Sequence, residues 1–324
     1  MIIIKVYPVV VPISLGNLQT VNFYIVRNDN QILLIDAGND DDDACWQQLN
    51  ERLKTLNASI HDIDAILLTH NHTDHIGLVN RIRQINPTIG VYAPSIAIPR
   101  IQRDETFFHQ RYDYYVSMFK YAGCGEDANE RLAQLEKTTF TKQKPMIEGP
   151  LIAFDPGQQL FDFRIIDSAG HSPDHVLFHH ESSNHAFVGD HFMAHSPSNA
   201  IVDIENDGTI FHSLIRYEQS LKHALTLKIE LAYPGHGEPM TEPNAVIKQK
   251  LERINNKAER IYETLTKPKT MATIAKELYK DRYYHPQLFS LIMSEIIGHV
   301  DRLVSLGVVE KEYIDGVYVI KRRG

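Results

Sequence analysis

Three histidines and one aspartate occupy six consecutive positions of this chain: His70, His72, Asp74 and His75 lie within residues 70–75. They follow a short apolar run, which predicts a buried strand that ends in a loop carrying these side chains. Imidazole and carboxylate groups at such spacing suit zinc, or less selectively iron or manganese. Without a cation, four titratable groups so close together would repel or desolvate one another. Chance pairs are common among 17 histidines, but chance does not readily give the H-x-H-x-D-H order.

Two metal ions need more ligands than this segment holds, and three later segments can supply them. In each, an apolar run ends at a glycine that is followed directly by His171, Asp190 or His236. Glycine at these points lets the backbone bend sharply and lets a metal approach closely. One such pair is weak support, but three of them after the cluster strengthen the prediction of a metal site.

Together these segments resemble the metallo-β-lactamase-fold hydrolases, from residue 1 to about residue 239. The resemblance implies an αββα sandwich and two metal ions whose ligands come from all four segments. The implied ligands are His70, His72 and His171 for the first metal; Asp74, His75 and His236 for the second; and Asp190 as the bridge between them.

Three further residues are expected close to the metals. Asp36 ends a strand-like run where the family places an aspartate behind the site, so we expect it to orient a ligand or a loop. The simpler interpretation of Asp36 is a turn residue before glycine. His175 is expected behind the metals or at the substrate, and His195 is expected to contact the substrate.

The resemblance also bears on the metal and the reaction. Diiron relatives that reduce oxygen carry a flavin domain and a glutamate where this chain has His72, so two zinc ions are favoured, with iron or manganese as alternatives. Two cations about 3.5–4 Å apart lower the pKa of a shared water from about 16 to about 7. The bridging hydroxide would attack a carbonyl or phosphorus centre, and Asp74 would accept its hydrogen bond and pass a proton to the leaving group. A mononuclear iron dioxygenase is the non-hydrolytic alternative.

Composition fits an enzyme of this kind. The chain has 324 residues, 43% of them apolar and 23% charged, with a net charge of −8. This length suits one large domain plus a small one. Two cysteines exclude a disulfide framework and fit a reducing compartment. A signal peptide and a membrane span are not expected, which predicts a cytoplasmic protein.

The apolar periodicity predicts a mixture of strands and helices, and therefore an α+β fold in which helices cover sheets. We assign residues 1–243 to the catalytic domain. Its expected strands are 21–26, 31–35 and 90–93, and its expected helices are 41–56 and 76–85.

Residues 95–146 interrupt this rhythm with a charged, aromatic-rich and helical stretch. Related enzymes carry insertions that shape the substrate site at this point. The stretch is either a lid whose aromatic side chains line the entrance to the metals or a helical insertion that packs on the sandwich. Arg111, Tyr112 and Tyr115 are its candidate substrate contacts.

Residues 244–324 are predicted to form a second, winged-helix-like domain. Expected helices over 244–266, 271–279 and 287–306 precede a hairpin that turns at 314–316. The same appendage follows the hydrolase domain in a lactamase-like group that includes single-strand endoribonucleases. From residue 245 onward the chain has 15 Lys/Arg against 10 Asp/Glu, whereas the preceding part has 18 against 31.

The third of these helices argues against nucleic-acid binding, because Arg302 is its one fixed cation. Packing, a lid or dimerisation, including a homodimer, is the favoured role. The sequence therefore favours a hydrolase of a small ester, thioester or lactone. A metal-dependent single-strand endoribonuclease with RNA as its substrate is the alternative.

Overall fold

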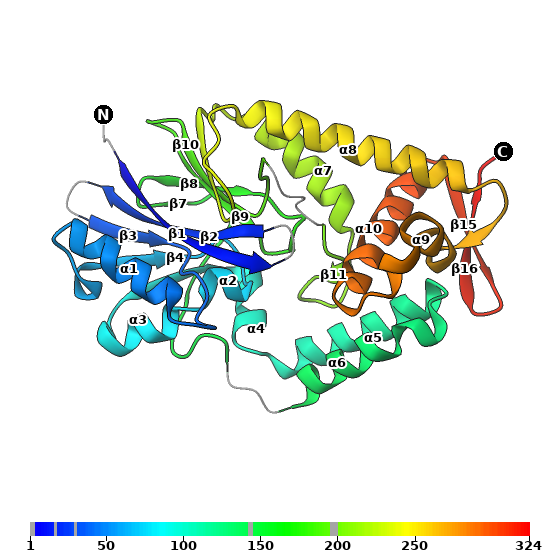
Figure 1. Cartoon of the computed structure of the whole chain (residues 1–324), viewed down its shortest axis with the longest axis horizontal. Coiled ribbons are helices and arrows are strands. Elements are labelled where there is room, and N and C mark those ends of the chain that lie inside the picture. The colour runs from blue at the N-terminus through cyan, green and yellow to red at the C-terminus, as the bar shows by residue number, and fades with distance from the viewer. Residues whose placement is uncertain (1–3, 16–17, 29–30, 142–144, 195–199) are drawn as a thin grey trace.

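The computed structural model describes residues 4–15, 18–28, 31–141, 145–194 and 200–324. Two β-sheets pack face to face on the left of the view in Figure 1. The first sheet has six strands in chain order: β1 (Lys5–Leu15), β2 (Leu18–Asn28), β3 (Gln31–Ile35), β4 (Ala65–Leu67), β5 (Gly90–Pro94) and β6 (Ile152–Phe154). The second sheet has the order β13 (Leu231–Pro234), β10 (His185–Gly189), β9 (Val176–His180), β8 (Phe163–Asp167) and β7 (Gln159–Leu160).

Side chains of each strand alternate between two apolar cores. In β2, Phe23 and Ile25 enter the core on the outer side of the first sheet, whereas Tyr24 and Val26 enter the core between the sheets. Successive residues of a strand point to opposite faces, so a strand covered on both sides reads as a continuous apolar run. This is why the ligand-bearing segments follow uninterrupted apolar stretches.

Helices cover both outer faces. The helices α1 (Ala44–Thr55) and α3 (Val79–Ile85) pack on the first sheet. The helices α7 (Ser213–Ala224) and α8 (Pro243–Thr264) pack on the second. This layering confirms the αββα sandwich predicted from the sequence.

The sequence predicts one helix over 76–85, but the structure has two shorter helices over this region. The short helix α2 (Thr73–Ile76) carries two of the predicted ligands, and α3 begins only at Val79. Between them, a Cβ atom on Gly77 would lie 2.6 Å from the backbone of Asn39, so the chain packs too closely there for any side chain. Because they belong to α2, Asp74 and His75 lie on a helical turn rather than in a loop.

Residues 95–146 are largely helical, as expected from the sequence. The elements are η2 (Ser95–Ala97), α4 (Ile98–Ile101), α5 (Glu105–Tyr121), η3 (Gly125–Ala128) and α6 (Asn129–Phe140). A small two-stranded sheet of β11 (Asp203–Ile204) and β12 (Ile210–Phe211) contacts α5.

The C-terminal part contains the expected helices and hairpin. After α8 follow β14 (Lys269–Thr270), α9 (Met271–Tyr279), η4 (Lys280–Tyr284), α10 (Pro286–Ser305), β15 (Val309–Ile314) and β16 (Val317–Arg322). Thr270 caps α9 by accepting a hydrogen bond from the backbone N–H of Thr273 at 3.2 Å. The hairpin turns at Asp315 and Gly316, which both have positive φ, as a type I′ turn requires. The winged-helix-like assignment stays a prediction.

One apolar core joins these C-terminal elements to the inserted helices. It includes Tyr115 and Phe119 of α5 together with Phe289 and Ile296 of α10. The long helix α8 spans both halves of the molecule (Figure 1), with Ile254 in the core of the sandwich and Ala258 in the C-terminal core. In the described part of the chain, no helix is both long enough and apolar enough to cross a membrane.

Candidate metal centre

All seven predicted metal ligands come together where strands of the two sheets end. They fall into three overlapping groups whose potential ligand atoms lie within 4.8 Å of one another. The groups are His70, His72 and His171; His70, His75 and Asp190; and Asp74, His75 and His236. The backbone N–H of Val176 donates to the carbonyl of Thr69 at 3.0 Å, which ties the second sheet to the segment that carries the histidine cluster.

Several ligand atoms at this point have no other partner. Nε2 of His70, His75 and His236 and Oδ1 of Asp190 are buried and accept or donate no hydrogen bond among the described residues. Buried polar atoms are rarely left unpaired in native proteins. A set of imidazole nitrogens and carboxylate oxygens is the donor set that zinc and similar divalent cations take. The residues present therefore fit a divalent metal site.

The carboxylate of Asp190 lies between the groups. Its Oδ2 is 3.6 Å from Nε2 of His171 and 3.4 Å from Nε2 of His236, and its Oδ1 is 3.4 Å from Nε2 of His75. Oδ2 of Asp74 lies 3.3 Å from Nε2 of His236. The Asp74 side chain is 27% exposed, against 8% for Asp190, so Asp74 is the carboxylate of the cluster that a substrate can reach.

The surroundings divide the histidines by protonation state. Burial lowers the pKa of His70 and of His72, which keeps both imidazoles neutral. Burial is the largest single influence on His75 and His236 and acts in the same direction, but Asp190 and the neighbouring carboxylates together outweigh it. The pKa of His75 is therefore raised well above its ordinary value, and that of His236 is raised to about 10. Protons on these two imidazoles balance the carboxylates in the metal-free protein.

Asp36 supports the centre from behind, as expected from the sequence. Its carboxylate lies 2.8 Å from Nδ1 of His75 and accepts hydrogen bonds from the backbone N–H and the hydroxyl of Thr69, both at 2.8 Å. The Thr69 hydroxyl lies 3.0 Å from Nδ1 of His70. One carboxylate thus orients two candidate ligand histidines, His75 directly and His70 through Thr69.

Thr20 supports His236, since its carbonyl oxygen lies 2.6 Å from Nδ1 of this imidazole. Thr20 and Thr69 were not among the predicted site residues. The position of Thr69, directly before the cluster, was the only signal in the sequence for either of them.

His175 is buried behind the cluster of candidate ligands. Its Nε2 accepts a hydrogen bond from the backbone N–H of Asp190 at 3.0 Å, and its Nδ1 lies 2.7 Å from the hydroxyl of Ser168. Burial lowers the pKa of His175 far below its ordinary value, so its ring is neutral and able to accept that bond. The ring fixes the backbone of Asp190.

Glycines leave room for the cluster, as the sequence pattern indicated. A Cβ atom on Gly235 would lie 2.5 Å from Oδ1 of Asp190 and 2.5 Å from Cε1 of His75. No side chain can occupy this position without moving two candidate ligands.

A cavity of about 480 Å³ opens in front of the cluster and is lined by His72, Asp74 and His171. Phe107, Phe108, Arg111 and Tyr115 of the inserted helices form part of its wall. Of the predicted substrate contacts, Arg111 and Tyr115 thus line this cavity. Tyr112 is not among its described lining residues, and its ring packs edge to face on Phe140 instead. His195 lies outside the described residues.

Arg111 is held firmly in this wall. Its Nε donates to Asp203 at 2.7 Å and its Nη2 to the hydroxyl of Tyr115 at 3.2 Å. The Tyr115 hydroxyl in turn donates to the carbonyl of Val202 at 2.8 Å. Arg100, Arg103 and Arg131 also line the cavity. This wall therefore presents positive charge next to the candidate metal ligands.

The comparison with protein families agrees with this geometry. A model of the Metallo-beta-lactamase superfamily matches residues 16–236. The chain belongs to this superfamily. A protein of Bacillus subtilis, named "Probable metallo-hydrolase YqjP", is 29% identical over 299 residues, which are 90% of this chain and 89% of that protein. A protein of Aspergillus fumigatus, named "Atrochrysone carboxyl ACP thioesterase", is 25% identical over 78% of this chain and 46% of its own length.

Solved structures of this superfamily share the fold over nearly the whole chain. The protein TTHA1429 of Thermus thermophilus superposes with a TM-score of 0.76 at 20% identity, over 98% of both chains. A beta-lactamase domain protein of Burkholderia ambifaria gives a TM-score of 0.74 at 20% identity, over 98% of this chain and 91% of that one. Membership and ligand set together make this metallo-β-lactamase superfamily chain a metal-dependent hydrolase whose cofactors are divalent metal ions.

Proposed function

We propose that this chain is a dinuclear zinc hydrolase of a small ester, thioester or lactone. The main support is the convergence of buried candidate ligand atoms of His70, His75, His236 and Asp190, which form no hydrogen bond with the described residues, beside the 480 Å³ cavity. The fungal relative named as a thioesterase supports an acyl substrate.

The residues take the following roles in this proposal. His70, His72 and His171 would hold one cation, Asp74, His75 and His236 would hold the other, and Asp190 would serve both. When bound, the two cations lower the pKa of a water and polarise the acyl carbonyl. Asp74, as the most exposed carboxylate of the cluster, accepts a proton at its Oδ atoms and returns it to the leaving group.

The inserted helices form the substrate wall in this proposal. Phe107, Phe108 and Tyr115 pack on the apolar part of the substrate, and Arg111 contacts an oxygen of its polar part. The aromatic side chains of α5 divide between two roles, because Phe107 and Phe108 line the cavity whereas Phe119 packs in the C-terminal core.

We assign a packing role to the C-terminal winged-helix-like elements rather than RNA recognition. In α10, the helix that would enter a groove of nucleic acid, Phe289, Met293, Ile296 and Val300 are buried in the C-terminal core. Its one arginine, Arg302, donates to Glu218 at 2.5 Å. Recognition of a phosphate backbone requires clustered cations on an exposed face, which this helix does not offer.

The proposal is tested with zinc-loaded protein on an aryl thioester, a lactone and a labelled single-stranded RNA. We expect turnover of an acyl substrate and none of RNA. Asp74→Ala should abolish turnover while the thermal unfolding curve stays cooperative, and His236→Ala should lower the metal content. Full turnover by a metal-loaded Asp74→Ala protein would overturn the assigned role, and RNA cleavage that needs Asp74 would replace the acyl substrate with RNA.

A further inference from the structure

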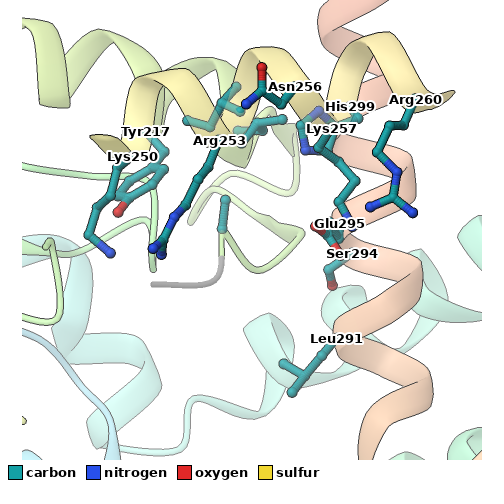
Figure 2. A pocket seen from close by; sticks show the side chains of 13 residues that line it. Tyr217, Lys250, Arg253, Asn256, Lys257, Arg260, Leu291, Ser294, Glu295 and His299 are labelled. Carbon is teal, nitrogen blue, oxygen red and sulfur yellow. Dashed lines mark ion pairs between the residues drawn. The ribbon is translucent and has the colours of Figure 1, made fainter. Parts of the chain in front are cut away.

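A second cavity, of about 360 Å³, lies between α8 and α10 and takes no part in the proposed reaction (Figure 2). Four cationic side chains of α8 line it: Lys250, Arg253, Lys257 and Arg260. Figure 2 shows them projecting from the same side of the helix. The cavity is concave, so its occupant can be enclosed rather than laid across a flat surface.

The spacing of these cations puts them on one face of α8. At about 100° per residue, the four positions fall within an arc of about 80°. By the same geometry the acidic residues Glu252, Glu259 and Glu263 lie outside this arc, about 100–140° from its middle. A helix face that is merely solvated usually mixes both signs of charge. Here the cations are separated from the acids and face the cavity.

The positive charge of this cavity is only partly compensated. Glu295 is its single acidic lining residue among those described and lies 3.2 Å from Nζ of Lys257. Within the described ranges, Arg253 and Arg260 form no ion pair. Burial, together with the nearby charge of Arg253, lowers the pKa of Lys250 to about 8. In a chain with a net charge of −8, the cationic side chains of this cavity form a local positive region that favours binding of an anion.

The second cavity adjoins the one in front of the metal cluster. Leu291 and Ser294 of α10 line both, and Ala200 lines one while the next residue, Ile201, lines the other. The two cavities therefore lie side by side, and a molecule that occupied both would pass Leu291 and Ser294.

We propose that the second cavity binds the phosphate-bearing end of an elongated acyl substrate whose carbonyl lies at the metal cluster. This inference rests on the proposed function and names its substrate class, a thioester or ester with a phosphorylated tail, of which coenzyme A thioesters are the available probe. Arginine favours phosphate because its planar guanidinium donates two parallel hydrogen bonds to phosphate oxygens. Phosphate charges would balance Arg253 and Arg260, which form no ion pair with the described residues.

The test compares two thioesters with the same acyl group, one on coenzyme A and one on pantetheine, which lacks the phosphates and the nucleotide. With the metal-loaded wild-type protein we expect a KM at least about tenfold lower for the coenzyme A thioester, a difference of about 1.4 kcal/mol. The double variant Arg253→Gln/Arg260→Gln should lose this preference with kcat unchanged and with the same KM for the pantetheine thioester. Lys248→Gln, on the opposite face of α8, is the matched control and should keep the preference.

A binding measurement separates this site from the reaction. Adenosine 3′,5′-bisphosphate should bind the metal-loaded wild-type protein in calorimetry and bind the double variant at least about tenfold more weakly. Equal KM values for the two thioesters, or no binding of the bisphosphate, would overturn the inference. Binding of single-stranded RNA that the double variant loses, without bisphosphate binding, would overturn it in favour of RNA. Failure to hydrolyse either thioester would instead contradict the proposed function. The bisphosphate measurement would then still show whether the second cavity binds phosphate.

Discussion

The carboxylate of Asp36 lies 2.8 Å from Nδ1 of His75, while Nε2 of the same imidazole lies 3.4 Å from Oδ1 of Asp190. His75 thus stands between a supporting carboxylate and the candidate metal centre. Asp36 has a φ of +58°, a backbone conformation that asparagine also tolerates. The substitution Asp36→Asn therefore removes the charge without straining the chain.

We expect Asp36→Asn to lower metal affinity or turnover by about 10- to 100-fold, because the orienting partner of a ligand histidine is weakened. Metal content after dialysis against a weak chelator and kcat at saturating metal measure the two effects separately. Asp64→Asn is a suitable control, since Asp64 accepts a hydrogen bond from the backbone of Ile32 away from the cluster. Wild-type metal affinity and turnover in Asp36→Asn would show that Asp36 is only a turn residue.

Gly235→Ala should remove metal binding through a steric effect alone. The added methyl group would lie 2.5 Å from both Oδ1 of Asp190 and Cε1 of His75, so both side chains must shift. Gly237→Ala is the matched control, because its Cβ atom would meet nothing within 4 Å although its φ is +81°. We expect the control to lose about 1 kcal/mol of unfolding free energy from backbone strain and to keep its metal. Equal metal content in the two variants would contradict the close approach at Gly235.

The parts of this molecule that the sequence predicted are those governed by local patterns. Burial on both faces gives β2 and β3 continuous apolar runs that can be recognised in the sequence. Thr270 and the Asp315-Gly316 pair mark a helix start and a hairpin turn through their own chemistry. The convergence of the candidate ligands was predictable because the family motif concentrates its histidines in one segment. Apolar runs ending in glycine indicated the other ligands.

Contacts between distant segments could not be predicted in the same way. Thr20 meets His236 across 216 positions of sequence, and Arg111 meets Asp203 across 92. The break at Gly77 depends on the backbone of Asn39, which belongs to another loop. Tyr112 and Tyr115 have similar local surroundings in the sequence, but only the rotation of α5 decides that Tyr115 lines the cavity.

Metal binding should release protons, and the affinity for metal should rise with pH. The raised pKa values of His75 and His236, about 10 for the latter, mean that both imidazoles hold a proton at pH 7 in the metal-free protein. A cation must displace these protons, so lower pH favours the proton and higher pH favours the metal. Calorimetric titration with Zn²⁺ at pH 7 in two buffers of different ionisation enthalpy should give a release of about two protons or more. An affinity that is constant between pH 6 and pH 8 would contradict this protonation pattern.

Asp203→Asn should destabilise the wall of the substrate cavity. Asp203 is buried and lies 2.7 Å from Nε of Arg111 and 3.9 Å from Nη2 of Arg100, which is itself 3% exposed. Removing its charge leaves two cations facing each other with no carboxylate between them, so we expect a loss of about 3 kcal/mol in unfolding free energy. Urea denaturation of the metal-loaded protein measures this loss. Asp207→Asn on the neighbouring exposed turn should cost far less, because asparagine can still accept the hydrogen bonds from Thr209. Equal stability of the two variants would mean that the Arg111–Asp203 pair is screened by solvent rather than held in the wall.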